Sequence, residues 1–224
     1  MKPNRFETII LAIIGVALAI AIYLSRTDET AFVEKFVVED GAIEWITVLA
    51  LAAGAIVMLR RCVRCKAKPW IFFRLALLGA GMVLIFGAGE EISWGQRIFD
   101  IETPEALKEA NRQSEMNLHN LEFGDISVNK LFSKFLAIFI ITYTIILPLL
   151  YRKYSGVADF LDRFAVPLPR PIHTIAWLVL IICTEAGPIA SKKSGEMTEF
   201  GGSALFLLII LFPMNAFIYR KGKA

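Results

Sequence analysis

Long uncharged apolar runs are the feature that most constrains the fold of this chain. Residues 8–25 carry no charged side chain, and several later runs are nearly as long. A helix needs ~20 residues to cross a bilayer, because it rises ~1.5 Å per residue through ~30 Å of hydrocarbon. The mean hydropathy of +0.60 over 224 residues exceeds what one soluble core requires. The sequence therefore predicts an all-α, polytopic membrane protein that forms a single transmembrane domain over residues 1–224.

Six spans are predicted from these runs. The first run is long enough to be retained as a span, although its basic N-terminal flank is like that of a signal peptide. The six predicted spans lie near residues 6–25, 42–59, 70–89, 131–151, 172–189 and 200–219.

The loops between these spans differ in charge. Segment 60–74 has six basic residues and no acidic one, and the segments after spans four and six are net basic. Segment 26–44 has six acidic and two basic residues, and segment 90–134 has nine acidic and five basic ones. Lys and Arg are enriched in cytoplasmic loops. Both termini are therefore predicted to be cytoplasmic, and the acidic loops are predicted to face outward.

The longest segment outside the spans, residues 90–130, is predicted to contain an interfacial helix. Thr103 followed by Pro104 and acidic residues is a typical helix start. Four residues separate Glu115 from His119, so the two would share one face of that helix.

Four predicted spans carry carboxylates at their outward ends. Glu44, Glu91 and Glu185 each have apolar neighbours on both sides, which makes them candidates for function. Glu91, rather than the adjacent Glu90, is predicted to be buried, since it would share a helix face with two glycines. A purely structural polar cluster is the alternative interpretation.

Roles follow from the chemistry of these side chains. Carboxylates and an imidazole transfer protons, and an arginine binds a phosphate or carboxylate bidentately. With one outward histidine, any metal would be an oxygen-liganded Mg²⁺, Ca²⁺ or Mn²⁺. The predicted catalytic residues are Glu91, Glu44, His119 and Glu115; the predicted substrate-binding residues are Arg97, Gln96, Asn117, Asn120 and Trp94; the predicted metal ligands are Glu185, Glu199 and Asp40.

Two classes of function compete for this outward site. The first is an enzyme, a hydrolase or transferase, that acts on a lipid or lipid-linked headgroup at the outer leaflet. The second is a non-catalytic sensor, assembly factor or subunit of a larger membrane complex. Transport is disfavoured, because no ionisable residue lies near the middle of any predicted span. The expected partners are membrane lipids and, for the second class, a periplasmic or membrane protein; no nucleic acid is expected.

Cys62 and Cys65 form a C-x-x-C pair in the basic loop. A structural zinc site needs four ligands, and no second cysteine pair is present to complete one. The pair is predicted to be reduced thiols in a membrane-anchoring loop, with a redox or acylation role as the alternative.

Several acidic and amide-rich motifs resemble a known family. They are "GEEISWGQRIF" at 89–99, "TPE" at 103–105, Asn111, Gln113, Glu115 and "NLHN" at 117–120, together with "VEDGAIEW" at 38–45 and "EMTEFGG" at 196–202. The pattern is similar to that of a family of uncharacterised bacterial multispan membrane proteins. The resemblance implies a bacterial inner-membrane protein with an outward polar site, and it implies no particular activity.

Overall fold

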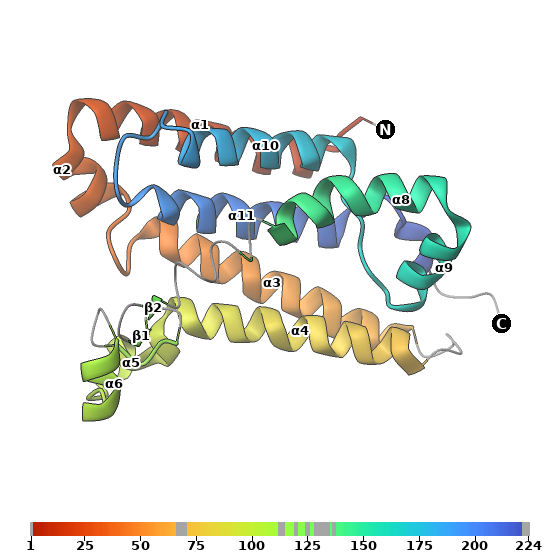
Figure 1. Cartoon of the computed structure of the whole chain (residues 1–224), viewed down its shortest axis with the longest axis horizontal. Coiled ribbons are helices and arrows are strands. Elements are labelled where there is room, and N and C mark those ends of the chain that lie inside the picture. Colours follow the sequence, from red (N-terminus) through yellow and green to blue (C-terminus); the bar gives the residue numbers. More distant parts are fainter. Residues whose placement is uncertain are drawn as a thin grey trace.

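The chain folds into a helical bundle with one very short strand pair (Figure 1). In the computed structural model, the strands β1 (Glu122–Phe123) and β2 (Ile126–Ser127) pair antiparallel. The predicted helical class is therefore confirmed. The structure describes residues 2–65, 71–111, 115–118, 121–123, 126–127, 135 and 138–220.

Four helices in the described part of the chain are long and apolar enough to cross a membrane. They are α1 (Arg5–Thr27), α3 (Ala42–Arg64), α4 (Ile71–Glu91) and α11 (Ser194–Leu211). The fifth predicted span is α10 (Pro171–Glu185), an apolar helix of 15 residues. The fourth is described from residue 138 onward, as a helix that includes η3 (Thr142–Ile146) and α8 (Leu147–Lys153). The remaining helical elements are α2 (Glu29–Ala31), η1 (Phe32–Phe36), η2 (Ser93–Gly95), α5 (Gln96–Phe99), α6 (Glu105–Ala110), α9 (Ser155–Arg163) and η4 (Ala216–Tyr219).

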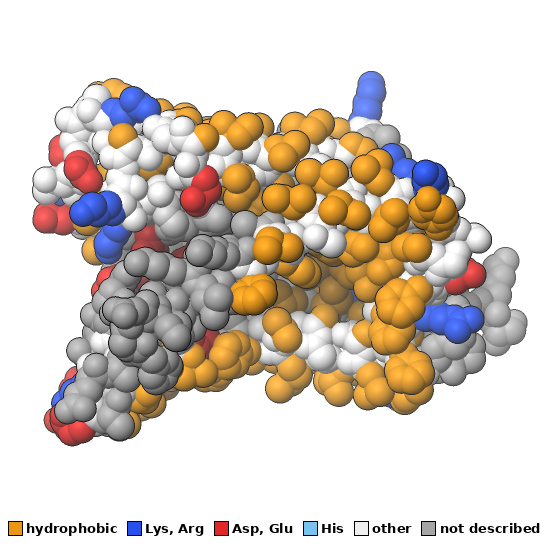
Figure 2. Space-filling view, in the orientation of Figure 1, with side chains coloured by type: hydrophobic (Ala, Val, Ile, Leu, Met, Phe, Trp, Pro, Cys, Tyr) orange, Lys and Arg blue, Asp and Glu red, His pale blue; other side chains and the backbone are white. Residues whose placement is uncertain are grey.

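The long helices pack in a consecutive order. α4 lies against α3, α3 against α11, and α11 against α10, while α1 contacts both α10 and α11 (Figure 1). Both chain ends lie at one end of the bundle, opposite to α2, α5 and α6 (Figure 1). We call the end formed by residues 28–41 and 92–111 the acidic end, and the end formed by residues 2–5 and 212–220 the terminal end. Hydrophobic side chains cover much of the visible surface between the two ends, and acidic side chains gather mainly at the acidic end (Figure 2).

Two adjacent glycines let α11 approach α10 closely. A Cβ atom on Gly201 would lie 2.7 Å from Leu180 Cδ1, and one on Gly202 would lie 2.8 Å from the Trp177 ring. Both Leu180 and Trp177 are buried, so neither can move aside into solvent. The small residues therefore set the distance between these two helices, as they do in many membrane bundles.

A proline inside the fourth helical pass explains its local widening. Pro148 has no N–H to donate to the carbonyl of Thr144, four residues earlier, and the backbone there forms the π-helical segment η3. The Thr144 carbonyl instead accepts a hydrogen bond from the hydroxyl of Thr174 on α10, at 2.9 Å. The contact compensates for the lost backbone bond and joins two helices.

Two predicted elements differ from those observed. The sixth span was placed at 200–219, but α11 begins at Ser194 and ends at Leu211, because Pro213 disfavours helical backbone at Phe212. The interfacial helix is also short, since α6 ends at Ala110. Asn111 then takes extended backbone, and its Nδ2 donates to the carbonyl and side chain of Asn117 at 2.7 and 2.9 Å. Glu115 is therefore not on a helix.

Candidate functional site

The acidic end is built around a sharp turn directly after α4. Ser93, Trp94 and Gly95 all have positive φ angles of 45°, 57° and 78°, a left-handed conformation that is costly for the first two residues. The turn folds Trp94 back onto α4, where a Cβ on Gly89 would lie 2.9 Å from the indole. The helix therefore stops at Glu91 instead of continuing outward, and α5 starts in a new direction.

Glu90 is the more buried of the two adjacent glutamates. Its side chain accepts hydrogen bonds from Trp94 Nε1 at 2.7 Å and from the backbone N–H of Leu118 at 2.6 Å, and the residue is 7% exposed. Glu91 is half-buried. The prediction that Glu91 rather than Glu90 is the buried residue was wrong, because it assumed a continuous helix and the turn instead brings Trp94 and Leu118 over Glu90.

Arg97 is the centre of the charged network at this end. Its Nη2 donates to Glu44 Oε1 at 2.5 Å, its Nη1 to Glu115 Oε1 at 2.6 Å, and its Nε lies 2.9 Å from Asp40 Oδ2. Three carboxylates from α3, from the turn before it and from the segment after α6 thus meet one guanidinium. Arg97 joins three parts of the chain that lie far apart in the sequence.

The surroundings of Arg97 keep it protonated. Burial lowers the pKa of its guanidinium, but the hydrogen bonds and charges of Glu115, Glu44 and Asp40 outweigh burial, so this pKa lies above its ordinary value. All three nitrogens of the guanidinium donate to carboxylates. The predicted role of Arg97 in binding an anionic substrate would require one carboxylate to be displaced.

Polar side chains hold the segment after α6 against the turn. Glu115 Oε2 accepts from Ser93 Oγ at 2.5 Å and from Asn117 Nδ2 at 2.8 Å. Gln96 accepts from the backbone N–H of Met116 at 2.7 Å and also donates to the Thr103 hydroxyl. Glu115, Asn117 and Gln96, all predicted as site residues, therefore lie in one hydrogen-bonded network with Arg97.

A second group of carboxylates comes from α3 and from α4 and α11, the two helices that pack most extensively against α3. Glu91 is within electrostatic range of Glu196, Glu44 and Glu90, and Glu199 is within range of Glu91, Glu196 and Glu44. In the described part of the chain, no hydrogen bond or ion pair reaches Glu91 or Glu199. Glu44 links this group to the Arg97 network. Glu91 and Glu199 thus lie within electrostatic range of the same acidic neighbours, Glu44 and Glu196.

The remaining predicted site residues lie elsewhere. Glu185 is exposed at the last residue of α10 and belongs to neither carboxylate group. His119 and Asn120 lie outside the described residues. Within the described ranges, no three or more His, Cys, Asp or Glu side chains are grouped so as to hold a metal ion. The metal site predicted from Glu185, Glu199 and Asp40 remains a prediction, and the structure places these three side chains in different surroundings.

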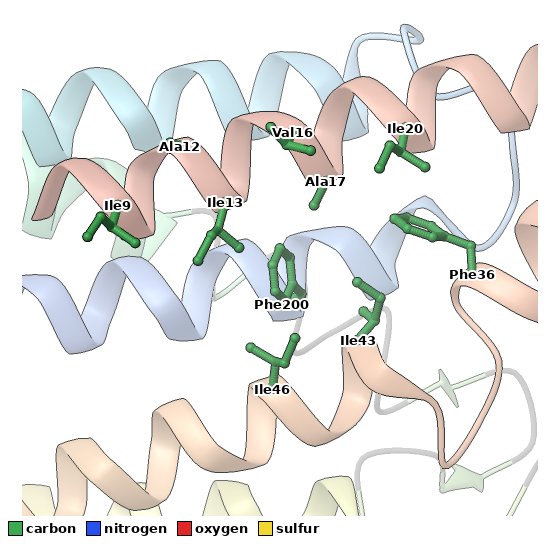
Figure 3. Close-up of a pocket in the computed structure, with 10 residues that line it drawn as sticks. All are labelled: Ile9, Ala12, Ile13, Val16, Ala17, Ile20, Phe36, Ile43, Ile46 and Phe200. Carbon is green, nitrogen blue, oxygen red and sulfur yellow. The ribbon is translucent and has the colours of Figure 1, made fainter. Parts of the chain in front are cut away.

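An apolar groove runs between α1 and α3 and is floored by α11 (Figure 3). Its volume is about 430 Å³, and one end is bounded by Phe36 and Ile43. Ile43 directly precedes Glu44, and Phe200 directly follows Glu199. The groove therefore approaches the acidic end. Its lining consists of Ile9, Ala12, Ile13, Val16, Ala17, Ile20, Phe36, Ile43, Ile46 and Phe200.

The terminal end contains a buried charged group that the sequence did not reveal. Arg170 Nη1 lies 2.6 and 2.7 Å from the two Glu7 oxygens, and His173 Nε2 lies 3.1 Å from Glu7 Oε1. Glu7 and His173 are fully buried. Neither Glu7 nor His173 was among the predicted site residues, because more than 160 residues separate Glu7 from its partners. Pro171 indicates that a helix starts next to Arg170, but it does not indicate that Arg170 pairs with Glu7.

Comparison with known proteins found no matching family model, no matching curated protein and no matching solved structure. The class of the protein therefore rests on its fold. In the described part of the chain, four helices are long and apolar enough to cross a membrane, which is compatible with an integral membrane protein.

Proposed function

We propose that the chain is a six-span protein of the bacterial inner membrane that acts as an enzyme on a lipid or lipid-linked headgroup at the outer leaflet. The excess of Lys and Arg in the loops at the terminal end supports a cytoplasmic location for that end. Both termini lie at the same end of the bundle, as an even number of spans requires (Figure 1). The acidic end then faces outward, at the depth of the outer-leaflet headgroups.

The electrostatic proximity of Glu91 and Glu199 is the observation that carries this proposal. The two carboxylates come from different helices, lie within electrostatic range and have no hydrogen bond or ion pair among the described residues. Neighbouring carboxyl groups in enzymes divide the roles of proton donor and proton acceptor. We assign proton transfer to Glu91, with Glu199 as its partner.

The residues around this pair act as support. Arg97 holds Glu44 and Glu115 in fixed positions, so we assign it a positioning role. Gln96 and Asn117 fix the segment that closes over the turn, and Trp94 covers the end of α4. His119, which lies outside the described residues, remains a candidate second acid–base group.

A lipid fits both the apolar and the charged features of this region. The groove between α1 and α3 offers an apolar site for an acyl chain close to Glu44 and Glu199 (Figure 3). Near that end of the groove there are more carboxylates than the Arg97 guanidinium can neutralise. Charge complementarity therefore favours a headgroup that carries an amine or is bound together with a divalent cation such as Mg²⁺, Ca²⁺ or Mn²⁺. We therefore favour a hydrolase or transferase with a lipid substrate of this kind.

A non-catalytic role is the second candidate. Side-chain hydrogen bonds through Gln96, Glu115 and Asn117 hold residues 93–97 and 115–118 together. Arg97 and the backbone N–H of Leu118 then join these residues to Glu44 on α3 and to Glu90 on α4. A rigid polar surface of this kind suits a binding partner in the periplasm or membrane. The protein would then be a sensor, assembly factor or subunit of a larger membrane complex.

The lipid composition of host membranes tests the enzymatic proposal. A host that lacks the protein would be complemented with the wild type, with Glu91→Gln, with Glu199→Gln, or with Glu185→Gln as a control outside both carboxylate groups. The wild type and Glu185→Gln are expected to restore the altered lipid species, and the other two variants to fail at equal protein levels. Identical lipid profiles in all strains, including the one that lacks the protein, would contradict an enzyme acting on lipids and favour the binding role.

A further inference from the structure

Two arginines at the terminal end have buried nitrogens without a hydrogen-bond acceptor. Arg61, in the last turn of α3, has a buried Nη1 without a partner, and Arg74, in the first turn of α4, has a buried Nε without one. No described carboxylate forms an ion pair with either arginine. A partly buried guanidinium without a counter-charge is costly. An anion from outside the described protein residues would supply the missing acceptors and balance both charges.

The two arginines lie on helix ends that are packed together. Arg61 lies over the ring of Tyr219, 3.9 Å from its centroid, and the Tyr219 hydroxyl donates to the Ala165 carbonyl at 2.6 Å. The free thiol of Cys62 donates to the carbonyl of Arg74 at 3.5 Å, which ties the end of α3 to the start of α4. Arg61 is thus held in place by stacking and not by an acid.

We propose that Arg61 and Arg74 form a binding site for a phosphate-bearing anion at the terminal end of α3 and α4. Guanidinium groups bind phosphate oxygens bidentately, and basic pockets between membrane helices bind anionic lipid headgroups. The phosphodiester of an anionic lipid in the leaflet at the terminal end is one source of that group, and free phosphate is the other. This site is independent of the carboxylates at the acidic end, so either assignment can fail without the other.

Thermal unfolding of the purified full chain in neutral detergent tests the site. The probes are phosphatidylglycerol, phosphatidylcholine and inorganic phosphate, and the readout is the Tm from tryptophan fluorescence. Phosphatidylglycerol at a hundredfold excess over its Kd is expected to raise the wild-type Tm by about 5–10 °C. Phosphatidylcholine, which has no net charge, is expected to raise it much less. An equal rise with inorganic phosphate would identify free phosphate as the ligand of the same site.

Variants separate binding from a structural effect. Arg61→Gln and Arg74→Gln are each expected to lose at least half of the Tm rise, even if their Tm without lipid also falls. Arg152→Gln is the control, because Arg152 is exposed at the same end of the bundle. A Tm rise that is unchanged in Arg61→Gln and Arg74→Gln, or that is equal for the charged and the neutral lipid, would overturn the proposal.

Discussion

Replacing Arg97 with alanine should destabilise the acidic end strongly, because one guanidinium neutralises three carboxylates. Removing it leaves Glu44 and Glu115, whose side chains are 12% and 13% exposed, without their charged partner. Asp40 is 49% exposed and can be solvated by water instead. The cost should therefore come mainly from the two glutamates.

The size of the effect can be estimated from these contacts. A hydrogen bond to a charged group contributes about 1.5–3 kcal/mol, and the half-exposed Asp40 pair adds about 0–1 kcal/mol. We expect Arg97→Ala to lower the free energy of unfolding by about 3–6 kcal/mol, a large share of the ~5–15 kcal/mol typical of a folded protein. For a chain of this size the loss corresponds to a fall in Tm of about 6 °C or more. Arg97→Lys keeps one charge but not the three-way geometry, so an intermediate fall is expected.

Thermal unfolding in detergent measures this fall. Lys108→Ala is the matched control, because it removes an exposed ion pair with Glu105 near the same end. The difference between wild type and Arg97→Ala should not change between about pH 6 and pH 9. A group whose pKa is raised on folding stabilises the protein fully at any pH below its unfolded pKa, and the pKa of the Arg97 guanidinium, already far above this pH range when unfolded, is raised further on folding by its carboxylate partners. Equal Tm values for Arg97→Ala and Lys108→Ala would refute the three-carboxylate arrangement.

Three further predictions concern the bundle and its orientation. Gly201→Ala should destabilise the protein by about 1–3 kcal/mol through the clash with Leu180, whereas Gly195→Ala, which has open space, should be nearly neutral in the same unfolding assay. Arg170→Gln should cost about 3–5 kcal/mol, because it leaves a buried carboxylate unpaired; a Tm near that of the wild type would contradict the buried ion pair. A reporter that is active only in the cytoplasm should work when fused after Ala224 and fail after Arg112, and the opposite pattern would reverse the orientation.

Hydropathy located most of the bundle because the length and polarity of a membrane helix are set by the bilayer itself. The predicted spans 42–59 and 70–89 start within one residue of α3 and α4. The last span was predicted too far along the chain, because the apolar run continues past Pro213. Hydropathy takes no account of the backbone N–H that a proline lacks. Hydropathy therefore predicted where most helices lie, but the end of α11 depends on the backbone chemistry of Pro213, which hydropathy does not include.

The site was less predictable because it depends on turns and on contacts distant in sequence. Clustering of carboxylates at one end followed from topology, and it brought Glu44 and Glu91 within electrostatic range as expected. The choice between Glu90 and Glu91 failed, because no periodicity rule predicts that Ser93 and Trp94 adopt left-handed backbone. Glu199 was proposed as a metal ligand and not as the neighbour of Glu91, since sequence alone does not fix how α11 is rotated.

Crosslinking of α4 to α11 tests the central claim most directly, namely that Glu91 and Glu199 share one opening at the acidic end. In a chain whose native cysteines are replaced by serine, Glu91→Cys would be combined with Glu199→Cys or, as the control, with Glu185→Cys. A short bifunctional thiol reagent added to intact membranes should join the first pair within one chain and leave the second pair unjoined. Efficient joining of the Glu185→Cys pair without joining of the Glu199→Cys pair would contradict the site described here.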